Sequence, residues 1–127
     1  MSRRLNDLSP TFKPYAVELL ARFTEAGIPV CIVDTLRTPE EHAKNLANGT
    51  SWTKHSLHLT GDAIDICPYD MYQLHGRQKL QWNSKDPVWE RLARIGEAMG
   101  LECGYRWQQK DCGHFQLPRP AQKEVLA

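Results

Sequence analysis

Two histidines and two aspartates are of the types that a hydrolytic metal site needs. His58 and Asp65 stand seven positions apart in one polar segment, and Asp111 precedes His114 by three positions much further along the chain. Two imidazoles and one carboxylate form a ligand set that suits a catalytic zinc ion, with water at the fourth tetrahedral position. A single histidine is more often a surface or core residue, so the metal-site hypothesis rests on these residues together.

Two further side chains could take part in hydrolysis. Zinc lowers the pKa of a bound water to about 7, and a carboxylate that does not bind the metal could accept the proton as hydroxide attacks a carbonyl. Asp111 is the candidate, because a turn that enters a strand can bring a short side chain beside the metal. Arg37 is expected at the end of a strand beside the same cleft, where a guanidinium would stabilise developing negative charge.

The remaining histidines and the aromatic residues have weaker signals. His42 and His75 have no ligand spacing and are expected to be solvated, whereas His55, three residues before His58, could line the cleft. Tyr72 is the aromatic residue expected to flank a substrate, while core packing is favoured for the tryptophans.

Local signals predict the helices that position these side chains. Ser9 is a candidate N-cap for the first, Thr38 and Glu41 form a capping box for the second, and Asp86 precedes the third. We therefore expect three helices, near residues 10–26, 39–48 and 87–99.

Short runs of β-branched or alternating residues predict the strands, at 28–36, 62–66, 101–107 and 114–117. Within the second run, Asp65 should point away from the side on which Ile64 and Ile66 pack. Residues 67–85 have no clear period and are expected to form a functional loop or a weak helix. The fold class is therefore α+β, with a small, mainly antiparallel sheet packed with about three helices in a single domain over residues 1–127.

Composition excludes several classes of protein. The chain has 127 residues, and 16 Lys and Arg against 15 Asp and Glu give a net charge of +1, which does not suggest nucleic-acid binding. No run approaches the roughly 20 apolar residues of a membrane span, and the start lacks the apolar segment of a secretory signal. Four cysteines at irregular spacing indicate buried hydrophobic residues rather than a disulfide scaffold. We expect synthesis in the cytoplasm.

These residues resemble a known family. The pattern Ser-x-His-x-x-Gly-x-Ala-x-Asp runs from Ser56 to Asp65, and an acidic residue, two spacers and a histidine follow from Asp111 to His114. This arrangement resembles the zinc peptidases that share the D-alanyl-D-alanine peptidase and hedgehog fold, and the chain looks like their phage endolysin branch. The likeness covers roughly residues 3–117.

The resemblance implies a role for each residue. His58, Asp65 and His114 would bind Zn²⁺, and Asp111 would be the general base and later the acid. Arg37 would hold the substrate or the oxyanion, and Ser56 would support a ligand or the substrate.

The resemblance also implies an activity. Carboxypeptidase-like and dipeptidase members usually carry glutamate at the position of Asp111. Its aspartate favours an L-alanyl-D-glutamate endopeptidase that cuts the peptidoglycan stem peptide over a D,D-carboxypeptidase or dipeptidase acting on D-alanyl-D-alanine. Such a phage endolysin is expected to be a monomer without a separate cell-wall-binding domain. A holin would have to permeabilise the host membrane before it could act on the wall.

Two alternatives from other classes stay open. A non-enzymatic zinc-binding module has a related fold in the hedgehog signalling domain, although the candidate base Asp111 argues against it. A non-haem iron oxygenase also uses two histidines and a carboxylate. The spacing disfavours that enzyme, because its motif places histidine and carboxylate one residue apart.

Overall fold

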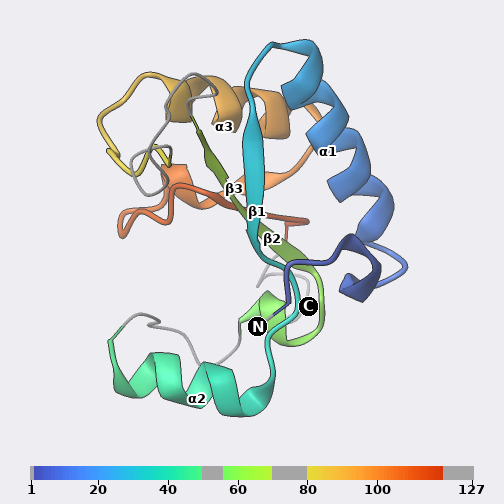
Figure 1. The fold of residues 1–127 in the computed structure, drawn as a ribbon, viewed down its shortest axis with the longest axis vertical. Helices are drawn as coiled ribbons and strands as arrows, with labels where there is room; N and C mark the ends of the chain where they lie inside the picture. The colour runs from blue at the N-terminus through green and yellow to red at the C-terminus, as the bar shows by residue number, and fades with distance from the viewer. Residues whose placement is uncertain (1, 50–55, 70–79, 119–127) are drawn as a thin grey trace, which may run out of the picture.

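A four-stranded antiparallel sheet lies at the centre of the computed structural model, which describes residues 2–49, 56–69 and 80–118 (Figure 1). The strand order is β1-β2-β4-β3. The strands are β1 (Val30–Asp34), β2 (Ala63–Pro68), β3 (Glu102–Cys103) and β4 (His114–Gln116). β3 pairs with β4, and all three pairs of neighbouring strands are antiparallel.

Within the described ranges, three α-helices accompany the sheet, as predicted: α1 (Lys13–Glu25), α2 (Pro39–Ala47) and α3 (Val88–Ala98). The capping box of α2 is confirmed, because the Thr38 side chain accepts from the Glu41 N–H and the Glu41 side chain accepts from the Thr38 N–H. The first helix begins three residues later than expected. The Ser9 hydroxyl does accept from the Phe12 N–H, but the residues between them form a turn that leads into α1.

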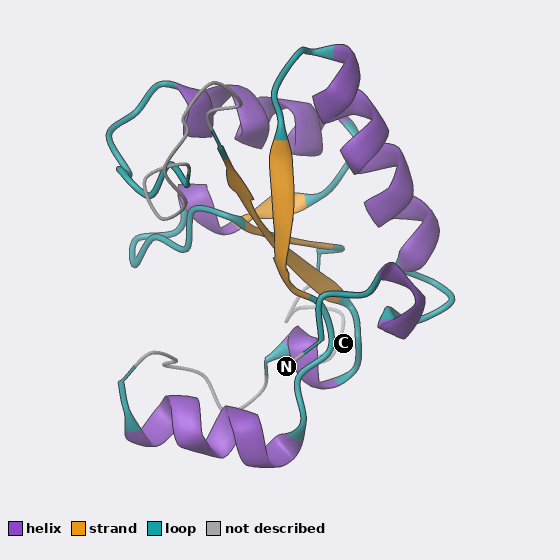
Figure 2. Ribbon diagram, in the orientation of Figure 1, coloured by secondary structure: helices purple, strands orange, loops and turns teal. Residues whose placement is uncertain are grey.

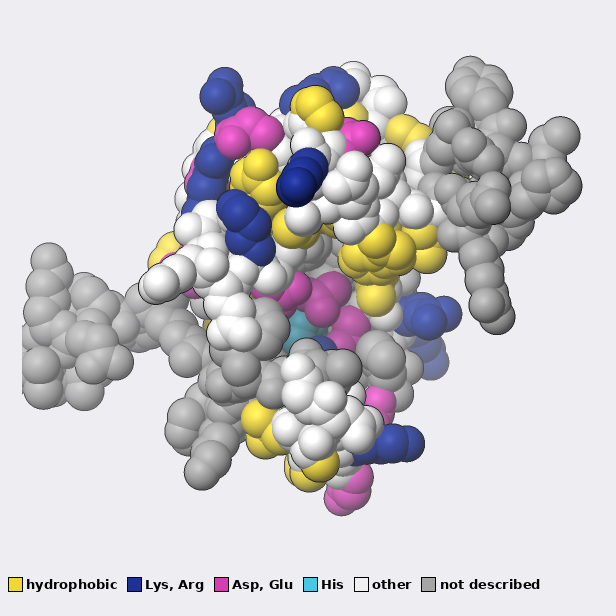
Figure 3. Space-filling view, turned by 90° about the vertical axis from the view of Figure 1, so that its left-hand side faces the viewer, with side chains coloured by type: hydrophobic (Ala, Val, Ile, Leu, Met, Phe, Trp, Pro, Cys, Tyr) yellow, Lys and Arg dark blue, Asp and Glu magenta, His cyan; other side chains and the backbone are white. Residues whose placement is uncertain are grey.

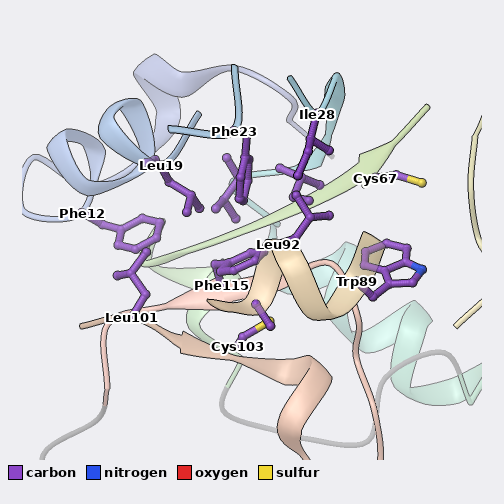
Figure 4. Packing of buried hydrophobic residues seen from close by; sticks show 14 of the residues in the cluster. Phe12, Leu19, Phe23, Ile28, Cys67, Trp89, Leu92, Leu101, Cys103 and Phe115 are labelled. Atoms are coloured by element: carbon purple, nitrogen blue, oxygen red, sulfur yellow. The ribbon is translucent and has the colours of Figure 1, made fainter. Parts of the chain in front are cut away.

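Helices α1 and α3 contact each other and pack together on the core side of the sheet, while α2 stands apart from it (Figure 2). The apolar stripes of α1 and α3 contact the side chains of β2 and β4 that point toward these two helices (Figure 4). Large members of this core are Phe12, Leu19, Phe23, Ile64, Ile66, Trp89, Leu92 and Phe115. In the described part of the chain, no helix is long and apolar enough to cross a membrane.

The predicted strand over 101–107 is much shorter in the structure. It ends at Cys103, and residues Gly104–Arg106 form a 3-10 helix, η4. The reason is a tight turn: the Gly104 carbonyl accepts from the N–H groups of both Trp107 and Asp111, so this backbone cannot continue a ladder with β4. Alternation of apolar residues alone did not reveal this turn.

A β-bulge in β1 decides which side chains reach the polar face of the sheet. Ile32 pairs with Ile66, but the register then shifts so that Asp34 lies opposite Asp65. Without the extra residue, Asp34 would point to the opposite face. The bulge therefore places an acidic side chain of β1 in the same row as Asp65.

Candidate metal centre

The three predicted metal ligands come from three elements that meet at one place. His58 lies on the 3-10 helix η2 (Leu57–Leu59), whose first turn is capped by the Ser56 hydroxyl, which accepts from the His58 N–H at 3.2 Å. Asp65 lies in β2, and its register partner in β4 is His114. Side chains of a residue pair directly opposite across two strands share a face, so the sheet itself brings Asp65 and His114 together.

The distances between these side chains are short. Asp65 Oδ1 lies 3.1 Å from His58 Nε2 and 2.9 Å from His114 Nδ1. One ligand atom from each residue can be chosen so that all three atoms lie within 4.8 Å of one another. A space-filling view shows a histidine among acidic side chains in a hollow of the surface (Figure 3). The chain therefore holds a candidate metal centre.

Each imidazole makes a hydrogen bond through the ring nitrogen that faces away from Asp65. The other ring nitrogen, which faces Asp65, is therefore suited to bind a cation. His58 Nδ1 donates to the Thr35 carbonyl at 2.9 Å, and His114 Nε2 donates to Gln116 Oε1 at 2.7 Å. Each neutral ring then presents a lone pair to Asp65, and His58 Nε2 is buried without a hydrogen-bond partner among the described residues. Three acceptors that face one another require a positive charge between them, so these residues fit a metal ion.

The electrostatics of the site agree with that fit. Burial acts to raise the pKa of the Asp65 carboxyl, but the imidazoles of His114 and His58, which donate to it when they carry a second proton, outweigh burial and lower that pKa. Burial opposes the charging of His114, yet the bond and the charge of Asp65, together with the charge of Asp111, raise the pKa of the imidazole. The site therefore attracts positive charge, whether it comes as a proton or as a metal ion.

Asp111 lies beside this centre and is open to solvent. Its Oδ2 is 3.7 Å from His114 Nδ1, and its side chain is 39% exposed. Partial burial and the nearby charge of Asp65 raise the pKa of the Asp111 carboxyl. A carboxylate with a raised pKa at the edge of such a site has the position and the proton affinity that a general base needs.

Arg37 is fixed in place at the rim of the site. Its Nε and Nη2 donate to Asp34 Oδ2 at 3.2 and 2.7 Å, and its Nη1 donates to His42 Nδ1 at 3.3 Å. Burial raises the pKa of the Asp34 carboxyl, although the charges of His58 and Arg37 act against it. The expectation that His42 is solvated was wrong: its side chain is buried and helps to hold the guanidinium.

Other expected residues fall outside the described part of the chain, among them His55, Tyr72 and His75. Three polar residues of the site were missed by sequence reasoning: Asp34, Glu102 and Gln116. Gln116 carried a usable signal, since it lies two positions after His114 in a strand and must share its face. Asp34 and Glu102 carried none, because a bulge and a strand pairing distant in sequence place them.

Comparison with known proteins gives the class and then the family. The family described as D-alanyl-D-alanine carboxypeptidase matches residues 49–117. An L-alanyl-D-glutamate peptidase of Escherichia phage T5 is 32% identical over 118 residues, covering 86% of this chain and 82% of that protein. An L-alanyl-D-glutamate peptidase of Listeria phage A118 is 29% identical over 104 residues, covering 81% of this chain and 35% of that protein.

A solved structure shares the fold. The L-Ala D-Glu endopeptidase ChiX of Serratia marcescens superimposes with a TM-score of 0.67 at 24% identity, over 97% of this chain and 87% of the other. That likeness shows the shared α+β fold, and the matching family together with the phage T5 relative shows that the chain is a peptidase. The chain belongs to the D-alanyl-D-alanine carboxypeptidase family.

Proposed function

We propose that this protein is a zinc-dependent endopeptidase that cleaves the L-alanyl-D-glutamate bond of the peptidoglycan stem peptide, as the endolysin of a bacteriophage. The observation that carries the proposal is the cluster of three acceptor atoms from His58, Asp65 and His114, with Asp111 beside it. The similarity to two phage L-alanyl-D-glutamate peptidases supports the choice of bond.

The three clustered residues would hold the zinc ion through His58 Nε2, Asp65 Oδ1 and His114 Nδ1. When bound, zinc supplies Lewis acidity, which polarises the scissile carbonyl and lowers the pKa of an attacking water. Side chains of the protein perform the remaining steps. Asp111 takes a proton from the water at its carboxylate and later returns it to the amine that leaves.

Arg37 would neutralise negative charge on the substrate. A guanidinium has five N–H donors, and three of them bind Asp34 and His42. The guanidinium is thereby held in one orientation, with its side chain still 12% exposed. A preorganised cation of this kind stabilises the charge that develops in acyl transfer, or binds a carboxylate of the stem peptide. Ser56 would act on the ligand His58 through the cap of η2.

The second candidate is a D,D-carboxypeptidase, because the matching family carries that description. Purified protein loaded with zinc and incubated with purified sacculi separates the two. An L-alanyl-D-glutamate endopeptidase releases fragments with new amino termini on D-glutamate, and mass spectrometry locates them. Release of terminal D-alanine alone would instead assign the carboxypeptidase activity. Zinc binding without any cleavage of sacculi, muropeptides or D,D-dipeptides would favour a binding module.

We further propose that residues 1–127 act as one catalytic domain and as a monomer that neither nucleic acid nor a membrane binds. A single apolar core shared by α1, α3 and the sheet supports the one-domain organisation. As in a phage lysis system, a separate holin would admit the enzyme from the host cytoplasm to the wall. Gel filtration with light scattering tests the monomer, and lysis of host cells with and without a co-expressed holin tests the route.

A further inference from the structure

A chain of hydrogen bonds continues outward from the candidate metal centre. His114 Nε2 lies 2.7 Å from Gln116 Oε1, and Gln116 Nε2 donates to Glu102 Oε2 at 2.9 Å. The side chain of Gln116 is buried, with 3% of the residue exposed. Glu102 on β3 is the register partner of Gln116 on β4, so the pairing of these two strands builds the contact.

The chemical types along this chain fix its direction. An ionised glutamate only accepts hydrogen bonds, so Glu102 requires the NH₂ group of Gln116. The amide must then turn its oxygen toward His114, and this oxygen requires an N–H at Nε2. A neutral imidazole with its proton on Nε2 has its lone pair on Nδ1, which is the atom that faces Asp65.

We propose, resting on the zinc site of the proposed function, that Glu102 is a positioning residue that sets the tautomer of His114 through Gln116. Glu102 acts through two side chains and does not touch the substrate or the metal. Its role is to keep the lone pair of His114 directed at the metal position. Partners of this kind around metal-binding histidines change metal affinity by about 10- to 100-fold when they are removed.

We call the hydrogen bonds from Glu102 through Gln116 to His114 the relay. A mutation that reverses their direction is the sharpest test of the proposal. Lysine only donates hydrogen bonds, so Glu102→Lys would turn the Gln116 oxygen outward and its NH₂ group toward His114. That arrangement favours a proton on Nδ1, where it blocks the metal. We expect Glu102→Lys to bind zinc at least tenfold more weakly than wild type, measured by competition with a chromophoric chelator.

A double variant restores the direction without restoring the original residues. In Glu102→Lys with Gln116→Glu, the lysine donates to the new carboxylate, which again accepts from Nε2 of His114. Zinc affinity should return to within about threefold of wild type. Proton NMR of the zinc-loaded protein should show an Nε2–H resonance of His114 that is protected from solvent exchange in wild type and in the double variant. In Glu102→Lys the NH₂ group of Gln116 offers this proton no acceptor, so the resonance should lose that protection.

Three further single variants complete the set, the last of them a control. Glu102→Gln allows both directions of the relay, so its zinc affinity should stay within about threefold of wild type. Gln116→Leu removes the relay and should weaken zinc binding about tenfold even if Glu102→Lys fails to fold. Glu18→Lys on α1 makes the same charge change far from the site and should leave zinc affinity unchanged.

Zinc binding of wild-type strength in folded Glu102→Lys or in Gln116→Leu would overturn the relay. A folded double variant that does not recover both affinity and the Nε2–H resonance would also overturn it. A wild-type chain that binds no zinc would overturn the proposed function as well. Zinc binding with cleavage of a different bond would overturn the substrate assignment alone.

Discussion

At the scale of single residues, Asp65 is the centre of the site. Its Oδ1 lies 3.1 Å from His58 Nε2 and 2.9 Å from His114 Nδ1, whereas Asp111 Oδ2 lies 3.7 Å from His114 Nδ1. This difference separates the acidic residue that would bind a metal from the acidic residue that would move a proton. The two roles can be tested independently.

Asp111→Asn should abolish most hydrolysis while metal binding is kept. The amide has nearly the same shape but cannot accept the proton, so we expect kcat to fall about 100- to 10,000-fold. His114→Ala should instead lose the metal and the activity together. Zinc content by elemental analysis, beside cleavage of a purified muropeptide, checks both variants. Hydrolysis at the wild-type rate in Asp111→Asn would contradict the role of this residue as base.

Arg37→Lys keeps the charge but loses the paired hydrogen bonds to Asp34. Because lysine cannot reproduce the planar fork of a guanidinium, the cation will be less well placed for the substrate. We expect kcat/KM to fall about tenfold or more, with zinc affinity unchanged. Steady-state kinetics on a muropeptide measure the loss, and Arg22→Lys on the surface of α1 is the control. Equal activity of the two variants would remove Arg37 from the site.

The sequence predicted the site residues unevenly, for a physical reason. His58 and Asp65 belong to one short motif, and Asp111 and His114 belong to another. Local spacing was therefore enough to select these residues. His42 was misjudged as solvated because helical position alone does not show that Arg37 packs against it. Contacts between distant segments depend on strand register, which no local pattern encodes.

At the scale of elements, β4 must approach β2 very closely to bring His114 opposite Asp65. A Cβ added to Gly113 would lie 2.0 Å from the Ile66 carbonyl oxygen, and the Ile66 N–H donates to the Gly113 carbonyl at 2.9 Å. Neither backbone can move away without breaking the pairing that places His114. Only glycine fits at this position.

Gly113→Ala should therefore damage both stability and the metal site. We expect a loss of about 1–3 kcal/mol in unfolding free energy from the forced backbone shift, together with weaker zinc binding. Gly100→Ala is the matched control: it has nothing within 4 Å and a φ of +84°, so it should cost only the strain of the left-handed backbone, about 1–2 kcal/mol. Urea denaturation and zinc titration distinguish the two. Wild-type zinc affinity in Gly113→Ala would refute the close-approach argument.

An ion-pair cluster fastens η4 to α3 and makes part of the stability dependent on pH. Hydrogen bonds from Arg106 and Arg94 lower the pKa of Glu90 to about 2. Because this value lies below the ordinary value of 4.5, the cluster stabilises the fold fully above about pH 4.5, and the contribution is lost as pH falls toward about 2.

Arg106→Gln should lower the thermal midpoint by no more than a few degrees at pH 7, since the side chains are partly exposed and screened by solvent. The difference from wild type should shrink as pH falls from 4.5 toward 2. Thermal unfolding followed by circular dichroism across this range measures it, with Arg4→Gln as the control. A difference that stays constant down to pH 2 would contradict the assignment.

Among the elements, those with local signals were predicted best. The capping box at Thr38 and the stop at Gly100, with its φ of +84°, act within one helical turn, and α2 and α3 agree closely with expectation. The short β3 and the bulge in β1 could not be foreseen, because each depends on the backbone of another segment. The physical reason is that a helix cap depends on residues close in sequence, whereas strand register depends on segments far apart in sequence.

At the scale of the whole molecule, stability and chemistry occupy different faces of β2. Ile64 and Ile66 pack under the helices, while Asp65 between them belongs to the polar cluster. The expectation that Asp65 points away from the side of its two isoleucine neighbours is confirmed. The core therefore lies on the opposite face of β2 from the site, and its side chains are not among the candidate ligands.

Leu92→Ala on α3 should test that separation. Removing a fully buried leucine leaves a cavity in the core, and we expect a loss of about 2–5 kcal/mol in unfolding free energy. Zinc affinity of the folded fraction should stay within about threefold of wild type, because no ligand moves. Urea unfolding of the metal-free protein and zinc titration below the transition measure the two quantities. A parallel collapse of zinc affinity would show that the faces are linked.

The alternation along β2 has a practical consequence for enzyme engineering. Since side chains of opposite parity along this strand serve different purposes, a mutant library can vary the substrate-binding position Arg37 while Asp111, Ile64 and Ile66 are kept. Most members of such a library would remain folded, so a screen would sample new substrate preferences instead of collecting misfolded chains.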